Sequence, residues 1–265
     1  MIRLSAHLST LFPGVPELER PTAARSLGFT AVETWWPPAD DRDAWVAAVS
    51  AASVRAVLVI ADGGDLAAGE RGFCTVAERH DEVVASVRDA MELARACGGA
   101  TVNLLAGRID PATSEEAQRA AALDAVRASA DEAVRLGGRV VIEHLNAHDV
   151  ARPLLPTPAA AAAFVRDADH EGVRLLFDAY HAHRAGVDPI DALGEVADVL
   201  GHVQYSDSPG RGAPGTGEID LARLVDRLDE LGYDGHVGLE FTPAGSSLGW
   251  LPKLAPAFRR GAKLG

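Results

Sequence analysis

The sequence is poor in cysteine and lacks a long apolar run. Its two cysteines, Cys74 and Cys97, form neither a disulfide framework nor a zinc-finger spacing. Both are therefore expected to be reduced, as is typical of the cytoplasm. No apolar run reaches the roughly 18 residues that a membrane span requires, and residues 1–5 lack the features of a signal peptide. These absences predict a soluble, cytoplasmic protein with no membrane partner.

Positive charge is also scarce. The 25 basic residues are outnumbered by 38 acidic ones, which gives a net charge of −13. Such a surface repels phosphate backbones, so nucleic acid is not an expected partner. A small-molecule substrate remains compatible with this charge, because one metal ion or arginine can reverse the local field. A homo-oligomer is left open.

Several catalytic motifs are absent. The chain contains no Gly-x-Ser-x-Gly elbow and no His-Glu-x-x-His, and neither cysteine is placed as an obvious nucleophile. No glycine-rich dinucleotide turn follows the first apolar segment, and the glycine-rich stretch 206–220 lacks the Gly-Lys-Ser/Thr of a P-loop. We therefore expect no nucleotide cofactor.

Short apolar segments alternate with longer amphipathic stretches from end to end. Strands are expected at 2–8, 30–34, 56–61, 101–106, 140–145, 173–178, 202–206 and 237–241. Helices are expected at 17–27, 43–52, 81–97, 114–136, 158–168 and 221–231. This alternation predicts βαβ units and a parallel sheet. Since no linker divides the 265 residues, and a barrel of about 250 residues is one standard solution, we predict an α/β fold with a single (β/α)₈ barrel domain over 1–265.

Polar residues stand where the last four strands should end. They are Glu143 after Val140–Ile142, Asp178 after Leu175–Phe177, Gln204 after His202–Val203 and Glu240 after Val237–Leu239. Successive strand ends ring one mouth of a barrel, so these side chains should converge. The alternative is that each only begins a solvated loop, but three crowded acids would repel one another without a cation. Carboxylate and amide oxygens suit Mg²⁺ or Mn²⁺, so the sequence predicts a divalent metal site.

Three further residues are candidates around this mouth. His181, three residues beyond Asp178, is expected to contact a substrate oxygen or serve as a second metal ligand. Arg211 lies in the glycine- and proline-rich stretch 206–220, where a guanidinium would bind an anionic substrate, unless the loop is only a connector. Glu33, on the second strand, is a candidate for orienting a metal ligand.

With these residues the sequence resembles the hydroxypyruvate isomerase family within the xylose-isomerase-like barrels, over nearly the whole chain. The matching stretches are Arg3–Phe12, Ala67–Gly72, Ile142-Glu143 with Asn146, Phe177–His181, Gly201–Gln204, Arg211–Ile219 and Gly238–Glu240. The resemblance implies that Glu143, Asp178, Gln204 and Glu240 bind the metal and that the two glutamates exchange protons with the substrate. It also implies that His181 and Arg211 contact substrate oxygens.

The chain departs from the family pattern in the expected pocket walls. His144 stands where the family often has proline, and Thr242 stands where a lysine is common. Ile60 and Leu66 occupy positions where an asparagine and an aromatic residue are expected. These departures leave the reaction class better defined than the substrate.

The function predicted from the sequence is a metal-dependent aldose–ketose-type isomerase. The best candidate reaction converts hydroxypyruvate to tartronate semialdehyde, with Glu143 and Glu240 moving a proton through an enediolate that the metal stabilises. A ketose 3-epimerase or a polyol dehydratase would use the same residues and stays an alternative. A non-catalytic binding protein is a third one.

Overall fold

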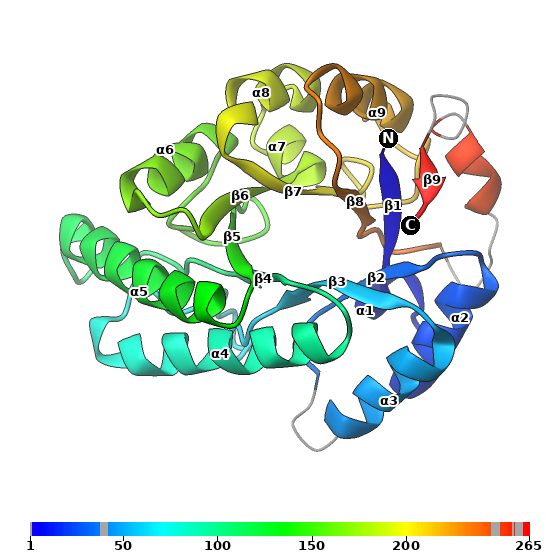
Figure 1. The fold of residues 1–265 in the computed structure, drawn as a ribbon. Coiled ribbons are helices and arrows are strands. Elements are labelled where there is room, and N and C mark those ends of the chain that lie inside the picture. Colours follow the sequence, from blue (N-terminus) through cyan, green and yellow to red (C-terminus); the bar gives the residue numbers. More distant parts are fainter. Residues whose placement is uncertain (1, 38–41, 245–249, 256, 258–261) are drawn as a thin grey trace.

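The computed structural model describes residues 2–37, 42–244, 250–255, 257 and 262–265. Within them, eight parallel strands pair in chain order, and β8 pairs with β1 to close a barrel (Figure 1). The strands are β1 (Arg3–His7), β2 (Ala31–Thr34), β3 (Arg55–Ile60), β4 (Thr101–Leu104), β5 (Arg139–Glu143), β6 (Val173–Asp178), β7 (Leu200–Tyr205) and β8 (His236–Leu239). The predicted (β/α)₈ fold is confirmed.

Helices surround the ring of strands (Figure 1). They are α1 (Leu8–Leu11), α2 (Arg20–Ser26), α3 (Arg42–Ala52), α4 (His80–Ala96), α5 (Glu115–Arg135), α6 (Pro158–Ala168), α7 (Ala179–Arg184), α8 (Pro189–Glu195) and α9 (Leu221–Glu230). Side-chain caps fix several starts: Ser114 accepts from the Ala117 N–H, and Thr157 from the Ala160 N–H. No helix among the described residues is long and apolar enough to cross a membrane.

Four of the helices and strands were missed in the sequence, among them the four-residue helix α1. α7 and α8 lie between β6 and β7, and each is too short to display a helical period. The two-residue strand β9 (Lys263–Leu264) pairs with β1 outside the barrel order, where Leu4 is the partner of Leu264. Two residues are too few to show the alternation of apolar and polar side chains by which a strand is predicted.

The main core lies between the outer face of the barrel and the helices. A smaller apolar cluster of Leu58, Val141 and Leu176 belongs to β3, β5 and β6. Since side chains alternate between the faces of a strand, Val141 and Leu176 share a face with Glu143 and Asp178, two residues further on. This cluster therefore forms an apolar floor beneath those acids.

Candidate functional site

The structure brings the four predicted strand-end residues to one end of the barrel. Glu143 and Asp178 are the last residues of β5 and β6, Gln204 lies in β7, and Glu240 directly follows β8. Asp178 is the register partner of Gln204. All four side chains are buried. Since the strands are parallel, their carboxyl ends share one mouth, as the sequence predicted.

In two of these carboxylates, those of Glu143 and Asp178, one oxygen accepts hydrogen bonds from the protein. Asn103 of β4 donates its side-chain N–H to Glu143 Oε2 at 2.7 Å. Asp178 Oδ1 accepts the backbone N–H groups of Tyr180 at 2.7 Å and His181 at 3.4 Å, and so caps α7. Asp178 Oδ2 is buried without a hydrogen-bond partner, while Glu143 Oε1 lies 3.8 Å from His181 Nε2. Each acid therefore keeps one oxygen available for a ligand.

Gln204 is held in a comparable way by its nitrogen. Its Nε2 donates to Glu33 Oε2 at 2.9 Å, and its Oε1 is buried without a partner. Burial alone would raise the pKa of Glu33, but His202, His7 and Ser5 oppose it and lower that pKa to about 2. Glu33 is thus an ionised acceptor for the Gln204 amide.

The residues at this mouth fit a hard divalent cation. Burying an oxygen without a partner is costly, and Asp178 Oδ2 and Gln204 Oε1 are two such atoms. Burial, Glu240 and Asp178 raise the pKa of Glu143 well above its usual range. Burial, which outweighs Arg211, raises the pKa of Asp178 to about 7. A cation would satisfy both free oxygens and favour the ionised acids.

His181 lies close to these acids, and its tautomer decides what it can do. Ligand atoms of Glu143, Asp178 and His181 all lie within 4.8 Å of one another. His181 Nδ1 accepts the backbone N–H of Asn146 at 3.0 Å, and burial and Arg211 lower the pKa of His181 well below its usual range. The neutral ring therefore carries its proton on Nε2 and offers a donor, which suits a substrate oxygen better than a cation.

Arg211 faces the same acids from the loop after β7. Its Nη2 lies 3.1 Å from Glu240 Oε2 and 3.8 Å from Asp178 Oδ2. Burial alone would lower the pKa of Arg211, but the carboxylates of Glu240, Asp178 and Glu143 raise it. Arg211 is therefore a fixed positive charge at the mouth.

The loop that carries Arg211 is internally fixed. The carboxylate of Asp207 accepts four backbone N–H groups, from Ser208, Thr216, Gly217 and Ile219. A Cβ on Gly217 would collide with the Ser208 carbonyl oxygen, so only glycine fits there. The Thr242 N–H also donates to the Arg211 carbonyl at 2.9 Å. These bonds make the loop a support for Arg211.

Two residues of the site were missed in the sequence analysis. His7, the last residue of β1, is fully buried, and neither of its ring nitrogens has a hydrogen-bond partner. Its Nε2 lies 3.6 Å from Glu240 Oε1. That oxygen accepts a hydrogen bond from Trp35 Nε1 at 3.4 Å. Asn103, already described, is the second. Both are polar residues in otherwise apolar segments, and that signal was available.

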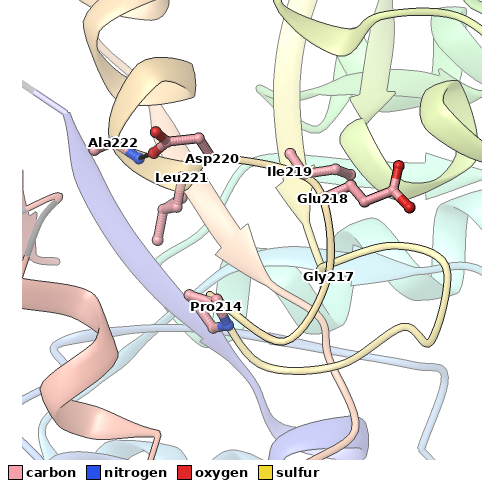
Figure 2. Close-up of a pocket in the computed structure, with 8 residues that line it drawn as sticks. Pro214, Gly217, Glu218, Ile219, Asp220, Leu221 and Ala222 are labelled. Carbon is pink, nitrogen blue, oxygen red and sulfur yellow. Dashed lines mark hydrogen bonds between the residues drawn. The ribbon is translucent and has the colours of Figure 1, made fainter.

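A separate pocket does not coincide with this site. It has a volume of about 420 Å³ and opens between the loop 214–219 and the start of α9 (Figure 2). Its two acids do not converge, since Glu218 points away from Asp220 in Figure 2. Asp220 already accepts the Ala222 N–H at 2.8 Å as the cap of α9. None of the four strand-end residues lines it.

A closed parallel barrel with buried acids at its carboxyl end has the architecture of a barrel enzyme, whose active site lies at that end. A family model described as "Xylose isomerase-like TIM barrel" matches residues 21–258. The chain belongs to this family. The resemblance inferred from the sequence is thereby confirmed.

Two curated relatives cover almost the whole chain. One from Streptomyces coelicolor is 37% identical, over 97% of this chain and 98% of its own, and is provisionally named a hydroxypyruvate isomerase. Another from Cupriavidus necator, named 2-oxo-tetronate isomerase, is 32% identical over 95% of this chain and 98% of its own. The names of both relatives denote isomerases.

A solved structure from Brucella melitensis has a similar fold. It is 30% identical, has a TM-score of 0.91, and covers 97% of this chain and 99% of its own. That protein is named an AP endonuclease of family 2. The names of similar proteins therefore point to two kinds of chemistry.

Proposed function

We propose that the protein is a metal-dependent isomerase of short 2-oxo acids that carry a hydroxyl group on the neighbouring carbon. Hydroxypyruvate is the best candidate, with tartronate semialdehyde as the product. Hydroxypyruvate and 2-oxo-tetronate, which the relatives' names mention, share this chemistry and a carboxylate. The observation that carries the proposal is the guanidinium of Arg211 beside buried Glu240 and Asp178, because it offers an anion a place next to acid–base groups.

The expected metal ligands are Glu143, Asp178, Gln204 and Glu240. When bound, a divalent cation would stabilise the negative charge that develops on the substrate oxygens. The oxygen-rich ligand set favours Mg²⁺ or Mn²⁺ as this cation.

The chain's own residues account for the proton movements. One of Glu143 and Glu240 removes a proton from the carbon that bears the hydroxyl, and a proton returns to the former carbonyl carbon. The hydroxyl oxygen loses its proton as it becomes the aldehyde oxygen, and the former carbonyl oxygen gains one. Burial raises the pKa of Glu143, which favours it as the group that holds the proton between the two transfers. His181 donates its Nε2–H to the carbonyl oxygen, and Arg211 binds the carboxylate.

A nuclease function is the second candidate, because the similar Brucella protein is named an endonuclease. The net charge of −13 argues against it, since binding DNA requires the neutralisation of phosphates. A ketose 3-epimerase would return the proton to the carbon that lost it, and a dehydratase would expel water instead.

The test is an assay of metal-free protein reloaded with Mg²⁺ or Mn²⁺, with hydroxypyruvate, 2-oxo-tetronate, neutral ketoses and a cyclic polyol as substrates. NMR in D₂O should detect tartronate semialdehyde with deuterium on the former carbonyl carbon. A chelator should abolish the conversion. Full activity without metal, or epimerisation of a ketose in place of isomerisation, would contradict the proposal.

A further inference from the structure

Glu33 occupies an unusual position inside the barrel. It is fully buried on β2, yet it contacts a side chain of β7, with β8 and β1 between them in the barrel order. The two strands between them carry small residues at this level, since Gly238 of β8 and Ser5 of β1 are register partners. A Cβ on Gly238 would collide with both carboxylate oxygens of Glu33.

The two oxygens of Glu33 have different partners. Oε1 accepts from Ser5 Oγ at 2.6 Å and lies 2.8 Å from His202 Nε2. Oε2 accepts from Gln204 Nε2 at 2.9 Å. A carboxylate can only accept, so the Gln204 amide must turn its nitrogen toward Glu33. The free Oε1 of Gln204 then faces away from Glu33, buried and without a partner.

We propose that Glu33 is a positioning residue that fixes the orientation of the Gln204 amide, so that an oxygen and not an NH₂ group is presented to the metal. If the Gln204 amide were rotated by 180°, its shape would be nearly the same, but its NH₂ group would face the metal. The partial positive charge on those hydrogens would repel the cation. The inference rests on the proposed metal site, and Glu33 itself does not touch the metal or the substrate.

The Glu33→Gln variant tests this at atomic level. Its Oε1 can still accept from Ser5 and His202, and in that orientation its NH₂ group takes the position of the present Oε2. That group donates to Gln204, whose amide then rotates and turns its own NH₂ toward the metal. We expect Mn²⁺ to bind roughly 10- to 100-fold more weakly, as for other losses of outer ligand support.

A second substitution should reverse the effect. In Glu33→Gln/Gln204→Glu, the new Glu accepts from the new Gln with one oxygen and offers its other oxygen to the metal. The pair keeps its number of hydrogen bonds and its net charge, so the Mn²⁺ affinity should recover to within about fivefold of the original. Ser5→Ala is the matched control, since it removes one donor to Oε1 and leaves the bond to Gln204 intact.

The experiment is a titration of metal-free protein with Mn²⁺, followed by calorimetry and by the electron spin resonance of free Mn²⁺, with circular dichroism to verify folding. A Glu33→Gln variant that binds Mn²⁺ as tightly as the original protein overturns the inference. If that variant does not fold, the double variant decides: Mn²⁺ affinity near the original supports the inference, and lost affinity in a folded protein overturns it. Failure of the original protein to bind Mn²⁺ would instead overturn the proposed metal site.

Discussion

Replacing Arg211 separates substrate binding from metal binding. Two unit charges about 4 Å apart interact by about 4 kcal/mol at an effective dielectric constant of about 20. Truncating one partner of a desolvated charge pair costs about 2–5 kcal/mol. Since the Arg211 side chain is 32% exposed, solvent screening favours the lower half of this range. We expect Arg211→Ala to lose about 3 kcal/mol, or roughly a hundredfold in kcat/KM, on hydroxypyruvate.

The metal affinity should move in the opposite direction. The guanidinium lies 3.8 Å from Asp178 Oδ2 and 3.1 Å from Glu240 Oε2, so it competes with a cation for these acids. Arg211→Ala should therefore bind Mn²⁺ at least as tightly as the original protein. A loss of both activity and metal affinity would mean that the substitution damages the site as a whole.

Arg211→Lys and a neutral substrate sharpen the test. Lysine keeps the charge but lacks the planar two-point fork, so it should restore only part of the loss on a 2-oxo acid. On a neutral ketose the loss should be smaller. Arg108→Ala is the matched control. It also removes a guanidinium, but one whose hydrogen bonds go to the carbonyl oxygens of Ala151 and Gly69 and not to the acids of the site. Steady-state kinetics that show unchanged kcat/KM for Arg211→Ala would refute the reasoning.

Three further predictions address the acids and the missed histidine. Glu143→Gln and Glu240→Gln should each lower kcat by about 10²- to 10⁴-fold in steady-state assays, and an active variant would exclude that residue from proton transfer. Because the pKa of Asp178 is raised to about 7, metal-free protein should lose stability in thermal melts as pH rises toward 7, and Mn²⁺ affinity, measured by calorimetry, should fall up to tenfold per pH unit below 7. A flat profile would contradict this. His7→Ala should lower kcat/KM in the same kinetic assay, and His7→Asn should restore part of it if the ring binds a substrate oxygen, whereas a purely structural His7 would change only the melting temperature.

The barrel and the meeting of the four strand-end residues could be predicted because both follow from chain order. In a parallel barrel, every strand ends at the same mouth, so position along the strand is sufficient to place Glu143, Asp178 and Glu240. The strand bounds themselves differed by up to two residues. Glu240, expected inside a strand, lies one residue beyond β8.

Side-chain contacts between strands could not be predicted in this way. Asn103 reaches Glu143 because β4 pairs with β5, with Leu104 opposite Ile142. Glu33 reaches Gln204 only because Gly238 lacks a side chain. Such contacts depend on register and on the size of residues in other strands, and no local pattern contains that information. The sequence suggested that Glu33 orients a ligand, but only the structure shows that the residue it contacts is Gln204.

The role of His181 illustrates where spacing stops being informative. A histidine three residues after an acidic strand end fits a metal ligand and a substrate contact equally well. What separates the two is the backbone N–H of Asn146, which donates to Nδ1 and so leaves the ring proton on Nε2. That N–H belongs to the loop after β5 and is 35 residues away in the chain. The Asn146 side-chain Nδ2 lies 2.7 Å from the same Nδ1, so two nitrogens of one loop residue favour this tautomer, and the assignment of His181 as a donor depends on that loop and not on its distance from Asp178.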